Sequence, residues 1–266
     1  MENARLIVDR APYPGGAENM ARDEALLTAC TRPDHPVVLR FYGWHEPTIS
    51  LGYFQEFADL ETLEQPARDL SVVRRTTGGG AILHDLEVTY SLVIPITHPL
   101  VAGRPNSLYR LAHEAIIRTI GHGTRMLGTK NDSCDAPLSE ISGSSQRGPF
   151  FCFERRHDLD VVVDDPHGPA GVSKIAGSAQ RRTRTAILQH GSIMLDSRYA
   201  QQKVCTWSGP AGAIGYDQSV SRLAVSFGKA LEMEFVSSEW KDDELESTRQ
   251  FTRVYASDDW TLRRTR

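Results

Sequence analysis

Residues 74–85 read Arg-Arg-Thr-Thr-Gly-Gly-Gly-Ala-Ile-Leu-His-Asp. The residues just before them predict a strand, at 71–75, that runs directly into three glycines. Because glycine has no side chain, a ligand can approach the backbone there, and successive N–H groups can face its polar atoms. The run lacks the Lys-Ser/Thr ending of a phosphate-binding P-loop, so that nucleotide site is disfavoured. Taken alone, the run equally fits a tight turn with solvated arginines.

A second segment, Lys174-Ile175-Ala176-Gly177-Ser178-Ala179-Gln180, predicts a strand with a lysine among small residues. Alternation along a strand places four of these side chains on one face, namely those of Lys174, Ala176, Ser178 and Gln180. A lysine ammonium in such a place can contact a carbonyl or phosphate oxygen, where negative charge develops during acyl transfer. The alternative is an ordinary surface lysine on an edge strand.

Two further segments carry reactive side chains. Gln189-His190-Gly191-Ser192 is a polar run inside an otherwise apolar strand, which indicates a cavity wall. His190 is either a base or a hydrogen-bonded structural histidine. Cys152 lies between aromatic residues in Phe150-Phe151-Cys152-Phe153, which is typical of a buried hydrophobic cysteine. A reactive cysteine needs a cation or base nearby, and Lys174 would supply one if the fold brings the two together.

The expected secondary structure is rich in strands. Hydrophobic patterning predicts helices at 17–31 and 107–127 and strands at 5–9, 37–44, 48–53, 71–75, 89–96, 158–163, 173–181 and 185–195. Residues 45–47 predict a hairpin loop between two of these strands, and 173–195 predicts a second hairpin. Loops are expected at 128–149, which is polar and mobile, and at 164–171, and the segment 197–266 is expected to be mostly helical. The pattern predicts an α+β fold with a mixed, mostly antiparallel β-sheet flanked by helices.

The composition narrows the class of protein. The chain has 266 residues, 40% hydrophobic and 24% charged, with a formal net charge of -4, which disfavours a generic nucleic-acid binder. Neither a membrane helix nor a signal peptide is expected, so we expect a soluble, cytoplasmic protein. The nine histidines and four cysteines show no metal-ligand spacing, so no metal site is expected.

Further segments join these in a fixed order along the chain: Asn19–Leu27, Leu39–Trp44, Ser50–Gln55, the run 74–85, then 174–180, 188–193 and Tyr255–Trp260. Together they resemble the catalytic-domain superfamily of lipoate–protein ligases and biotin–protein ligases. Within it the chain looks most like the cysteine-dependent octanoyltransferases. The resemblance implies a single catalytic domain over residues 1–266. An apparent insertion at 164–171, an irregular loop before Cys152 and a short C-terminal helical region depart from the family pattern.

The resemblance implies a role for each site residue. Cys152 would hold the octanoyl group as a thioester, while Lys174 would hold the carbonyl oxygen and lower the pKa of Cys152. Ile82 and Leu83 would line a tunnel for the eight-carbon chain, which could select chain length at about 0.8 kcal/mol per buried methylene. The implied substrate-binding residues are Arg75, Gly78, Gly79, Gly80, Ala81, Ile82, Leu83, His84, Gly177, Ser178, Ala179, His190 and Gly191.

The resemblance also implies partners. The donor would be octanoyl-acyl carrier protein, and the acceptor a lysine of an apo lipoyl domain, in the glycine cleavage H protein or a dehydrogenase E2 protein. No cofactor, nucleic acid or membrane is expected, and a monomer is expected. Three alternatives remain: a lipoate–protein ligase that needs ATP and Mg²⁺ and has a structural Cys152, an octanoyl amidotransferase between lipoyl domains, and a non-catalytic paralogue that binds acyl chains or carrier domains. A biotin ligase is more distant, because the arginine-glycine run fits the lipoyl branch better.

Overall fold

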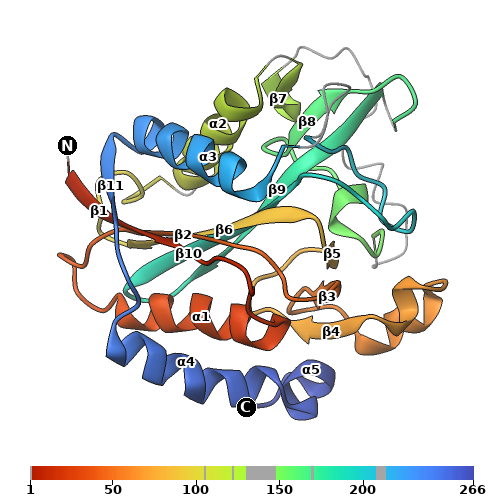
Figure 1. Ribbon diagram of the computed structural model, residues 1–266, viewed down its shortest axis with the longest axis horizontal. Helices are drawn as coiled ribbons and strands as arrows, with labels where there is room; N and C mark the ends of the chain where they lie inside the picture. Colours follow the sequence, from red (N-terminus) through yellow and green to blue (C-terminus); the bar gives the residue numbers. More distant parts are fainter. Residues whose placement is uncertain (1, 105, 122, 130–147, 169–170, 208–213) are drawn as a thin grey trace.

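The computed structural model describes residues 2–104, 106–121, 123–129, 148–168, 171–207 and 214–266, which form two sheets (Figure 1). The large sheet contains, in spatial order, β11 (Met233–Ser237), β1 (Glu2–Val8), β2 (Val38–Tyr42), β6 (Glu87–Pro95), β10 (Ala186–Met194), β9 (Val172–Arg182), β8 (Val161–Asp164) and β7 (Thr124–Met126). β1 runs parallel to both its neighbours, and the other pairings in this sheet are antiparallel. The small sheet consists of β4 (Ser71–Arg74), β3 (Thr48–Leu51) and β5 (Ile82–His84). The predicted α+β class and the mixed, mostly antiparallel sheet are confirmed.

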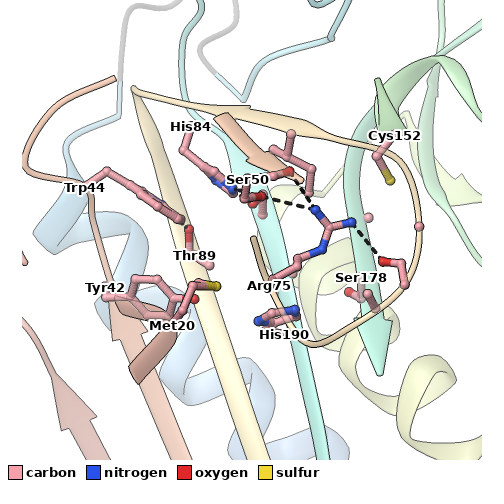
Figure 2. A pocket seen from close by; sticks show the side chains of 17 residues that line it. Met20, Tyr42, Trp44, Ser50, Arg75, His84, Thr89, Cys152, Ser178 and His190 are labelled. Carbon is pink, nitrogen blue, oxygen red and sulfur yellow. Dashed lines mark hydrogen bonds between the residues drawn. The ribbon is translucent and has the colours of Figure 1, made fainter. Parts of the chain in front are cut away.

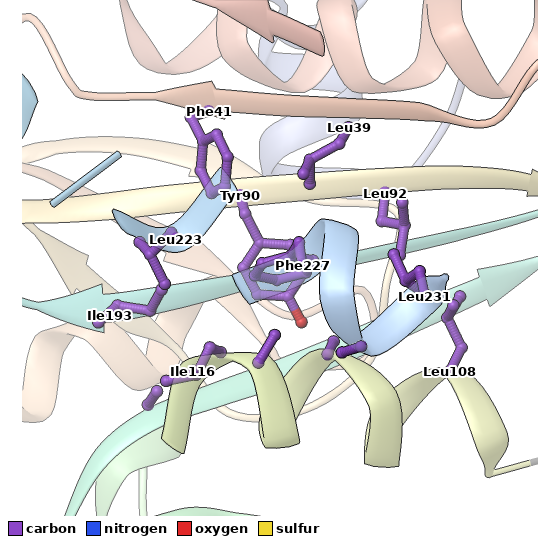
Figure 3. Packing of buried hydrophobic residues seen from close by; sticks show 14 of the residues in the cluster. Leu39, Phe41, Tyr90, Leu92, Leu108, Ile116, Ile193, Leu223, Phe227 and Leu231 are labelled. Atoms are coloured by element: carbon purple, nitrogen blue, oxygen red, sulfur yellow. The ribbon is translucent and has the colours of Figure 1, made fainter. Parts of the chain in front are cut away.

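Two helices, α2 (Ser107–Ile120) and α3 (Tyr216–Leu231), cover one face of the large sheet (Figure 1). Phe227 of α3 packs against Tyr90 of β6, with their ring centroids 5.1 Å apart (Figure 3). Leu108 and Ile116 of α2 lie on the same fully buried cluster, as their helical spacing requires. This layer holds the main hydrophobic core.

The opposite face of the sheet is covered by α1 (Gly16–Ala29), with α4 (Asp242–Tyr255) packed outside it and α5 (Asp258–Arg263) following (Figure 1). Leu26 of α1 packs against an apolar part of this face that includes Val93 and Leu188. Further along the same face the side chains become polar, with His190 and Ser192 taking the place of leucine on β10. The small sheet lies over this polar part, and the space between the two sheets is where a site can form.

Four short 3₁₀ segments complete the described elements: η1 (Phe57–Thr62), η2 (Ala67–Asp69), η3 (Leu127–Thr129) and η4 (Cys152–Glu154). The last of these begins at Cys152, after a loop whose residues 130–147 lie outside the described residues, as does most of the loop expected at 128–149.

Three sequence-based expectations are corrected. Residues 45–47 do not form a hairpin loop, because β2 and β3 belong to different sheets and the chain crosses between them there. The helix expected to reach residue 127 ends at Ile120, since Gly121 has a positive φ of 91° that continues no helix. The segment 197–266 is mostly helical but also contributes β11, which extends the sheet parallel to β1. The hairpin of β9 and β10 is confirmed.

A β-bulge in β9 corrects the expected facing of the lysine segment. Val161 pairs with Ala176 but the next residue of β8, Val162, pairs with Lys174, so β9 carries one extra residue, Ile175. The extra residue reverses the alternation, and Lys174 therefore shares a face with Gly177. Ser178 and Gln180 lie on the other face, toward α2, and Ala176 joins the main core.

Candidate active site

A cavity lies between the polar face of the large sheet and the small sheet (Figure 2). Its lining includes many residues singled out in the sequence: Cys152, Arg75, Gly78, Gly79, Ile82, His84, Gly177, Ser178, Ala179, His190 and Gly191. It also includes Ser192, from the polar run expected to form a cavity wall, and residues that were not assigned to the site from the sequence: Met20, Tyr42, Trp44, Ser50 and Thr89. Burial increases from one end to the other, since Gly79 is exposed and Cys152 is half-buried, whereas Tyr42 and Trp44 are buried. The glycine loop and Cys152 therefore lie at the mouth, and the two aromatic residues at the deep end.

The remaining predicted residues lie beside the cavity rather than in its wall. Ala81 and Leu83 pack into a hydrophobic cluster with Phe151 on the other side of the small sheet. This follows from strand alternation, because Ile82 and His84 take the cavity face of β5 and their neighbours cannot share it. Gly80 lies behind the loop, against Cys152.

Arg75 holds the glycine loop in shape. Its guanidinium donates to the carbonyl oxygens of Ser50, Gly78 and Gly80 at 2.8, 2.8 and 2.6 Å, and to the hydroxyls of Thr77 and Ser50 at 3.1 and 3.2 Å (Figure 2). These bonds occupy the five N–H donors of a guanidinium. Burial lowers the pKa of Arg75 to about 10. Arg75 therefore positions the loop and offers no spare donor to a substrate.

The absence of a side chain at Gly80 lets the cysteine segment pass against the loop. The Cys152 N–H donates to the Ala81 carbonyl at 2.7 Å, and the Ala81 N–H donates to the Phe150 carbonyl at 2.9 Å. A Cβ atom at Gly80 would lie 2.8 Å from the Cys152 nitrogen, which is closer than such contacts occur. Glycine at this position thus allows the backbone contact that places the thiol at the mouth.

Cys152 meets Lys174 although 21 residues separate them in sequence. The Lys174 Nζ lies 3.6 Å from the Cys152 Sγ and 3.3 Å from the Cys152 carbonyl oxygen, and it forms an ion pair with Asp160 at 2.9 Å. Burial alone would lower the pKa of Lys174, but the facing Cys152 thiolate and the Asp160 carboxylate outweigh it and raise that pKa above its usual value. The insertion expected at 164–171 does not prevent this contact. The arrangement presents a thiol beside a permanent buried cation.

The absence of a side chain at Gly177 leaves room for the Lys174 side chain. A Cβ atom there would lie 2.4 Å from the Lys174 Cε and 2.7 Å from its Nζ. The bulge and the glycine together therefore direct the ammonium back toward Cys152. Asp160, the partner of this ammonium, was missed in the sequence, because an isolated acid just before a strand has no distinguishing pattern.

His84 forms the centre of a buried polar network at the deep end. Its Nδ1 lies 2.8 Å from a Glu87 carboxylate oxygen and its Nε2 lies 2.7 Å from the Ser50 hydroxyl. Burial lowers the pKa of His84, and the opposing effect of the nearby Glu87 carboxylate is too small to reverse this. The Trp44 indole stacks on the imidazole with a centroid distance of 3.8 Å, and donates to the Thr89 hydroxyl at 2.9 Å. His84 and Trp44 are therefore both fixed in position by hydrogen bonds and by their stacking on each other.

His190 belongs to a second network. Its Nδ1 lies 3.0 Å from Asp23, and its Nε2 lies 2.7 Å from the Thr77 hydroxyl. Burial would raise the pKa of Asp23, but the His190 hydrogen bond and the Arg40 charge, 2.7 Å away, outweigh it and lower that pKa. Since both imidazole nitrogens are engaged, His190 is a hydrogen-bonded wall residue in this state.

Ser178 turns away from the cavity and joins a chain of hydrogen bonds beneath it. Its hydroxyl lies 2.7 Å from His113 Nε2 and 2.7 Å from the Tyr90 hydroxyl, which accepts from Gln189 at 2.7 Å. Burial lowers the pKa of His113 to about 4, so this imidazole is neutral at pH 7. A neutral His113 can accept a hydrogen bond from the Ser178 hydroxyl at Nε2 while its Nδ1–H donates to the Leu159 carbonyl.

Within the described ranges, no cluster of three or more histidine, cysteine or acidic residues could hold a metal ion. No helix in that same part of the chain is long and apolar enough to cross a membrane.

Comparison with known proteins adds a family. Residues 16–241 match the family described as the lipoyl protein ligase A/B catalytic domain. The octanoyltransferase LipM of Brevibacillus brevis is 32% identical over an alignment of 289 positions, gaps included, which covers 99% of this chain and 100% of that protein. The octanoyltransferase LipM of Kyrpidia tusciae is 34% identical, covering 93% of this chain and 95% of that protein.

Solved structures show the same fold. A putative lipoate protein ligase from Thermoplasma acidophilum with bound lipoic acid superposes with a TM-score of 0.72 at 22% identity, covering 98% of this chain and 99% of that one. A lipoate-protein ligase A bound with ATP gives a TM-score of 0.71 at 21% identity, with coverage of 98% and 99%. At these identities the likeness concerns the fold.

Proposed function

This chain belongs to the lipoyl protein ligase A/B catalytic domain family, and we propose that it transfers octanoyl groups through a thioester on Cys152. Its octanoyltransferase relatives align over nearly the whole chain, so the chain is an acyltransferase that moves an octanoyl group in lipoate synthesis. The proposal adds a donor, an intermediate and an acceptor: octanoyl-acyl carrier protein, the Cys152 thioester, and a lysine of an apo lipoyl domain.

One observation carries the proposal: the Lys174 ammonium lies 3.6 Å from the Cys152 sulfur at the mouth of the cavity. A thiolate is the reactive form of cysteine, and an adjacent buried cation stabilises it. Asp160 keeps the lysine protonated, and Gly80 and Gly177 leave the space that both side chains need.

In the first step the Cys152 thiolate attacks the carbonyl carbon of the donor thioester. A new carbon–sulfur bond forms, the carbonyl oxygen takes the negative charge, and the old carbon–sulfur bond then breaks to release the carrier thiolate, which takes a proton from solvent. The three ammonium protons of Lys174 point to Asp160, to the Cys152 carbonyl and to the sulfur. Once the sulfur is acylated, the third proton is free to turn to the oxyanion, where its charge stabilises the transition state.

In the second step a neutral lysine amine of the acceptor attacks the same carbonyl carbon. The carbon–nitrogen bond forms, the Cys152 thiolate leaves, and the amine loses a proton to solvent. The amide is more stable than the thioester, so this step drives the sequence forward. The donor is already activated as a thioester, so the proposal needs neither ATP nor a metal ion. Splitting the transfer at a covalent intermediate predicts ping-pong kinetics.

Intact-protein mass spectrometry tests the proposal. The purified protein is incubated with octanoyl-acyl carrier protein without ATP, beside Cys152→Ser and a control, Cys205→Ser, which changes another half-buried thiol. We expect a hydroxylamine-sensitive octanoyl adduct on the wild type and on Cys205→Ser, and none on Cys152→Ser. Adding an apo lipoyl domain should remove the adduct and leave a hydroxylamine-resistant octanoyl group on the acceptor.

Two results would overturn the proposal. An octanoylated acceptor formed equally well by Cys152→Ser would make the cysteine structural. A product that forms only when ATP, Mg²⁺ and free lipoate or octanoate are supplied would assign the chain to the ATP-dependent ligases.

A further inference from the structure

We infer that Trp44 is the end wall that limits acyl chain length, and that it separates the octanoyl cavity from a second, mostly apolar groove into which a longer chain would extend. This inference rests on the proposed function, because it assumes that the acyl group is attached to Cys152 and extends into the cavity.

The position of Trp44 makes it the far end of the cavity. Figure 2 shows the indole at the opposite side of the cavity from Cys152, with Arg75 and Ser50 between them. Cys152 is half-buried, whereas Trp44 is 6% exposed, so a chain that starts at the sulfur and runs inward meets the indole.

The indole is fixed in place by polar contacts. Its ring plane lies 13° from that of His84, and its Nε1 donates to Thr89. His84 is itself held between Glu87 and Ser50. A side chain held by a stack and a hydrogen bond resists displacement by an apolar ligand, so it acts as a stop rather than as a flexible end.

A second space begins directly behind this wall. A groove is lined by Trp44 and by the apolar parts of Tyr13, Leu86, Leu195, Ile214 and Tyr216, with the acidic residues Asp85, Glu87 and Asp196 also on its wall. Among the described residues, Trp44 is the side chain common to this groove and the octanoyl cavity. The rings of Tyr13 and Tyr216, which both line the groove, lie 5.0 Å apart. Shortening Trp44 would join the two spaces into one channel of greater length.

The test compares acyl chains of eight and twelve carbons. The probes are the N-acetylcysteamine thioesters of octanoate and dodecanoate, and the readout is the initial rate of Cys152 acylation by intact mass. The variants are Trp44→Leu, which keeps an apolar side chain, and Trp44→Phe, which keeps most of the wall. Each methylene that leaves water adds about fourfold to binding. We therefore expect Trp44→Leu to raise the ratio of dodecanoyl to octanoyl rates by at least about tenfold, and Trp44→Phe to change it by less than about threefold.

A second substitution shows where the longer chain goes. Leu86 lines only the groove behind the wall and is 38% exposed, so Leu86→Trp can fill that groove from its open side. We expect Leu86→Trp in the Trp44→Leu background to restore the preference for octanoyl, while Leu86→Trp alone leaves octanoyl acylation unchanged. An unchanged chain-length ratio in Trp44→Leu would overturn the inference, as would a longer-chain gain that Leu86→Trp does not reverse.

Binding measured without chemistry separates this inference from the proposed function. Isothermal titration calorimetry measures the affinity of octanoate and of dodecanoate for Cys152→Ser proteins with and without Trp44→Leu. It therefore tests whether Trp44 limits the length of the bound chain. Tighter dodecanoate binding in the Trp44→Leu protein supports the wall even if no acyl-enzyme forms. Equal dodecanoate binding in the two proteins refutes it even if octanoyl transfer is confirmed.

Discussion

Removing the negative charge that faces Lys174 should cost far more than removing an equally short ion pair at the surface. Lys174 and Asp160 lie 2.9 Å apart with side chains 3% and 8% exposed. Arg10 and Asp217 lie at the same 2.9 Å, but their side chains are 70% and 73% exposed. Asp160→Asn and Asp217→Asn therefore make the same chemical change at the same distance and differ in burial.

The expected magnitudes follow from burial. Breaking a buried pair by removing one partner costs about 3–5 kcal/mol, because the other charge is left without compensation. Asp217→Asn should cost less than about 1 kcal/mol, since water screens the pair. For a chain of this size, Asp160→Asn should lower the melting temperature by roughly 6–12 °C, and Asp217→Asn by no more than about 3 °C.

The pH dependence gives an independent check. The pKa of Lys174 is raised above its ordinary 10.5, so the stability that this lysine contributes is fully present below pH 10.5 and is lost only as pH rises through the higher folded value. The difference in unfolding free energy between wild type and Asp160→Asn should therefore stay constant from pH 6 to 9, in urea titrations at each pH.

A double-mutant cycle shows whether the cost belongs to the pair. Lys174→Met removes the buried cation, so Asp160→Asn should cost at least about 2 kcal/mol less in that background than in the wild type. Lys174→Met should also slow iodoacetamide alkylation of Cys152 at pH 7, because the thiolate loses the neighbouring ammonium. Equal costs for Asp160→Asn and Asp217→Asn, or additive effects in the cycle, would refute the reasoning.

Three further outcomes are expected. The folded pKa of His113 is about 4, so the stability that its neutral form contributes is present above pH 6.5 and is lost as pH falls toward 4. The wild type should therefore lose on the order of 3 kcal/mol more unfolding free energy between pH 6.5 and 4 than His113→Gln, measured by urea titration at each pH. Gly80→Ala should slow Cys152 acylation at least about tenfold by mass spectrometry, whereas Gly148→Ala, with nothing within 4 Å of its Cβ, should not. Arg75→Lys should lower the free energy of unfolding by about 2–4 kcal/mol, measured by denaturant titration, because an ammonium has three donors where the loop uses five.

Much of the fold was predictable from local pattern. The β9–β10 hairpin, the strand before the glycine run and the amphipathic α2 carry periodicities that a sequence displays directly. The crossing between β2 and β3 was not predictable, because a short connection that contains proline has the same sequence pattern whether its two strands pair with each other or enter different sheets. β11 was missed because its pairing with β1 depends on residues more than two hundred positions away.

The candidate site was predictable where a residue type is itself unusual. The resemblance singled out Cys152 and Lys174, and the structure brings them together. Asp160 and Trp44 were missed, because their positions depend on packing between segments rather than on any local pattern. Arg75 was expected to bind substrate, and only the hydrogen bonds of the folded loop reveal that its donors are occupied.

The bulge at Ile175 determines where the chain tolerates insertions and deletions during evolution. Adding or removing one residue between Lys174 and Gly177 would exchange the two faces of β9 and turn the ammonium toward α2. The turn at 164–171 is under no such restriction, because its ends are set by strand pairing and not by its length. Insertions and deletions a few residues before Lys174 should therefore leave the site intact, whereas a single insertion or deletion just after it should separate the ammonium from Cys152. Because of the bulge, Lys174 and Gly177 share a face although they are three positions apart. A sequence search that assumes regular strand alternation would place these two residues on opposite faces and would miss the site.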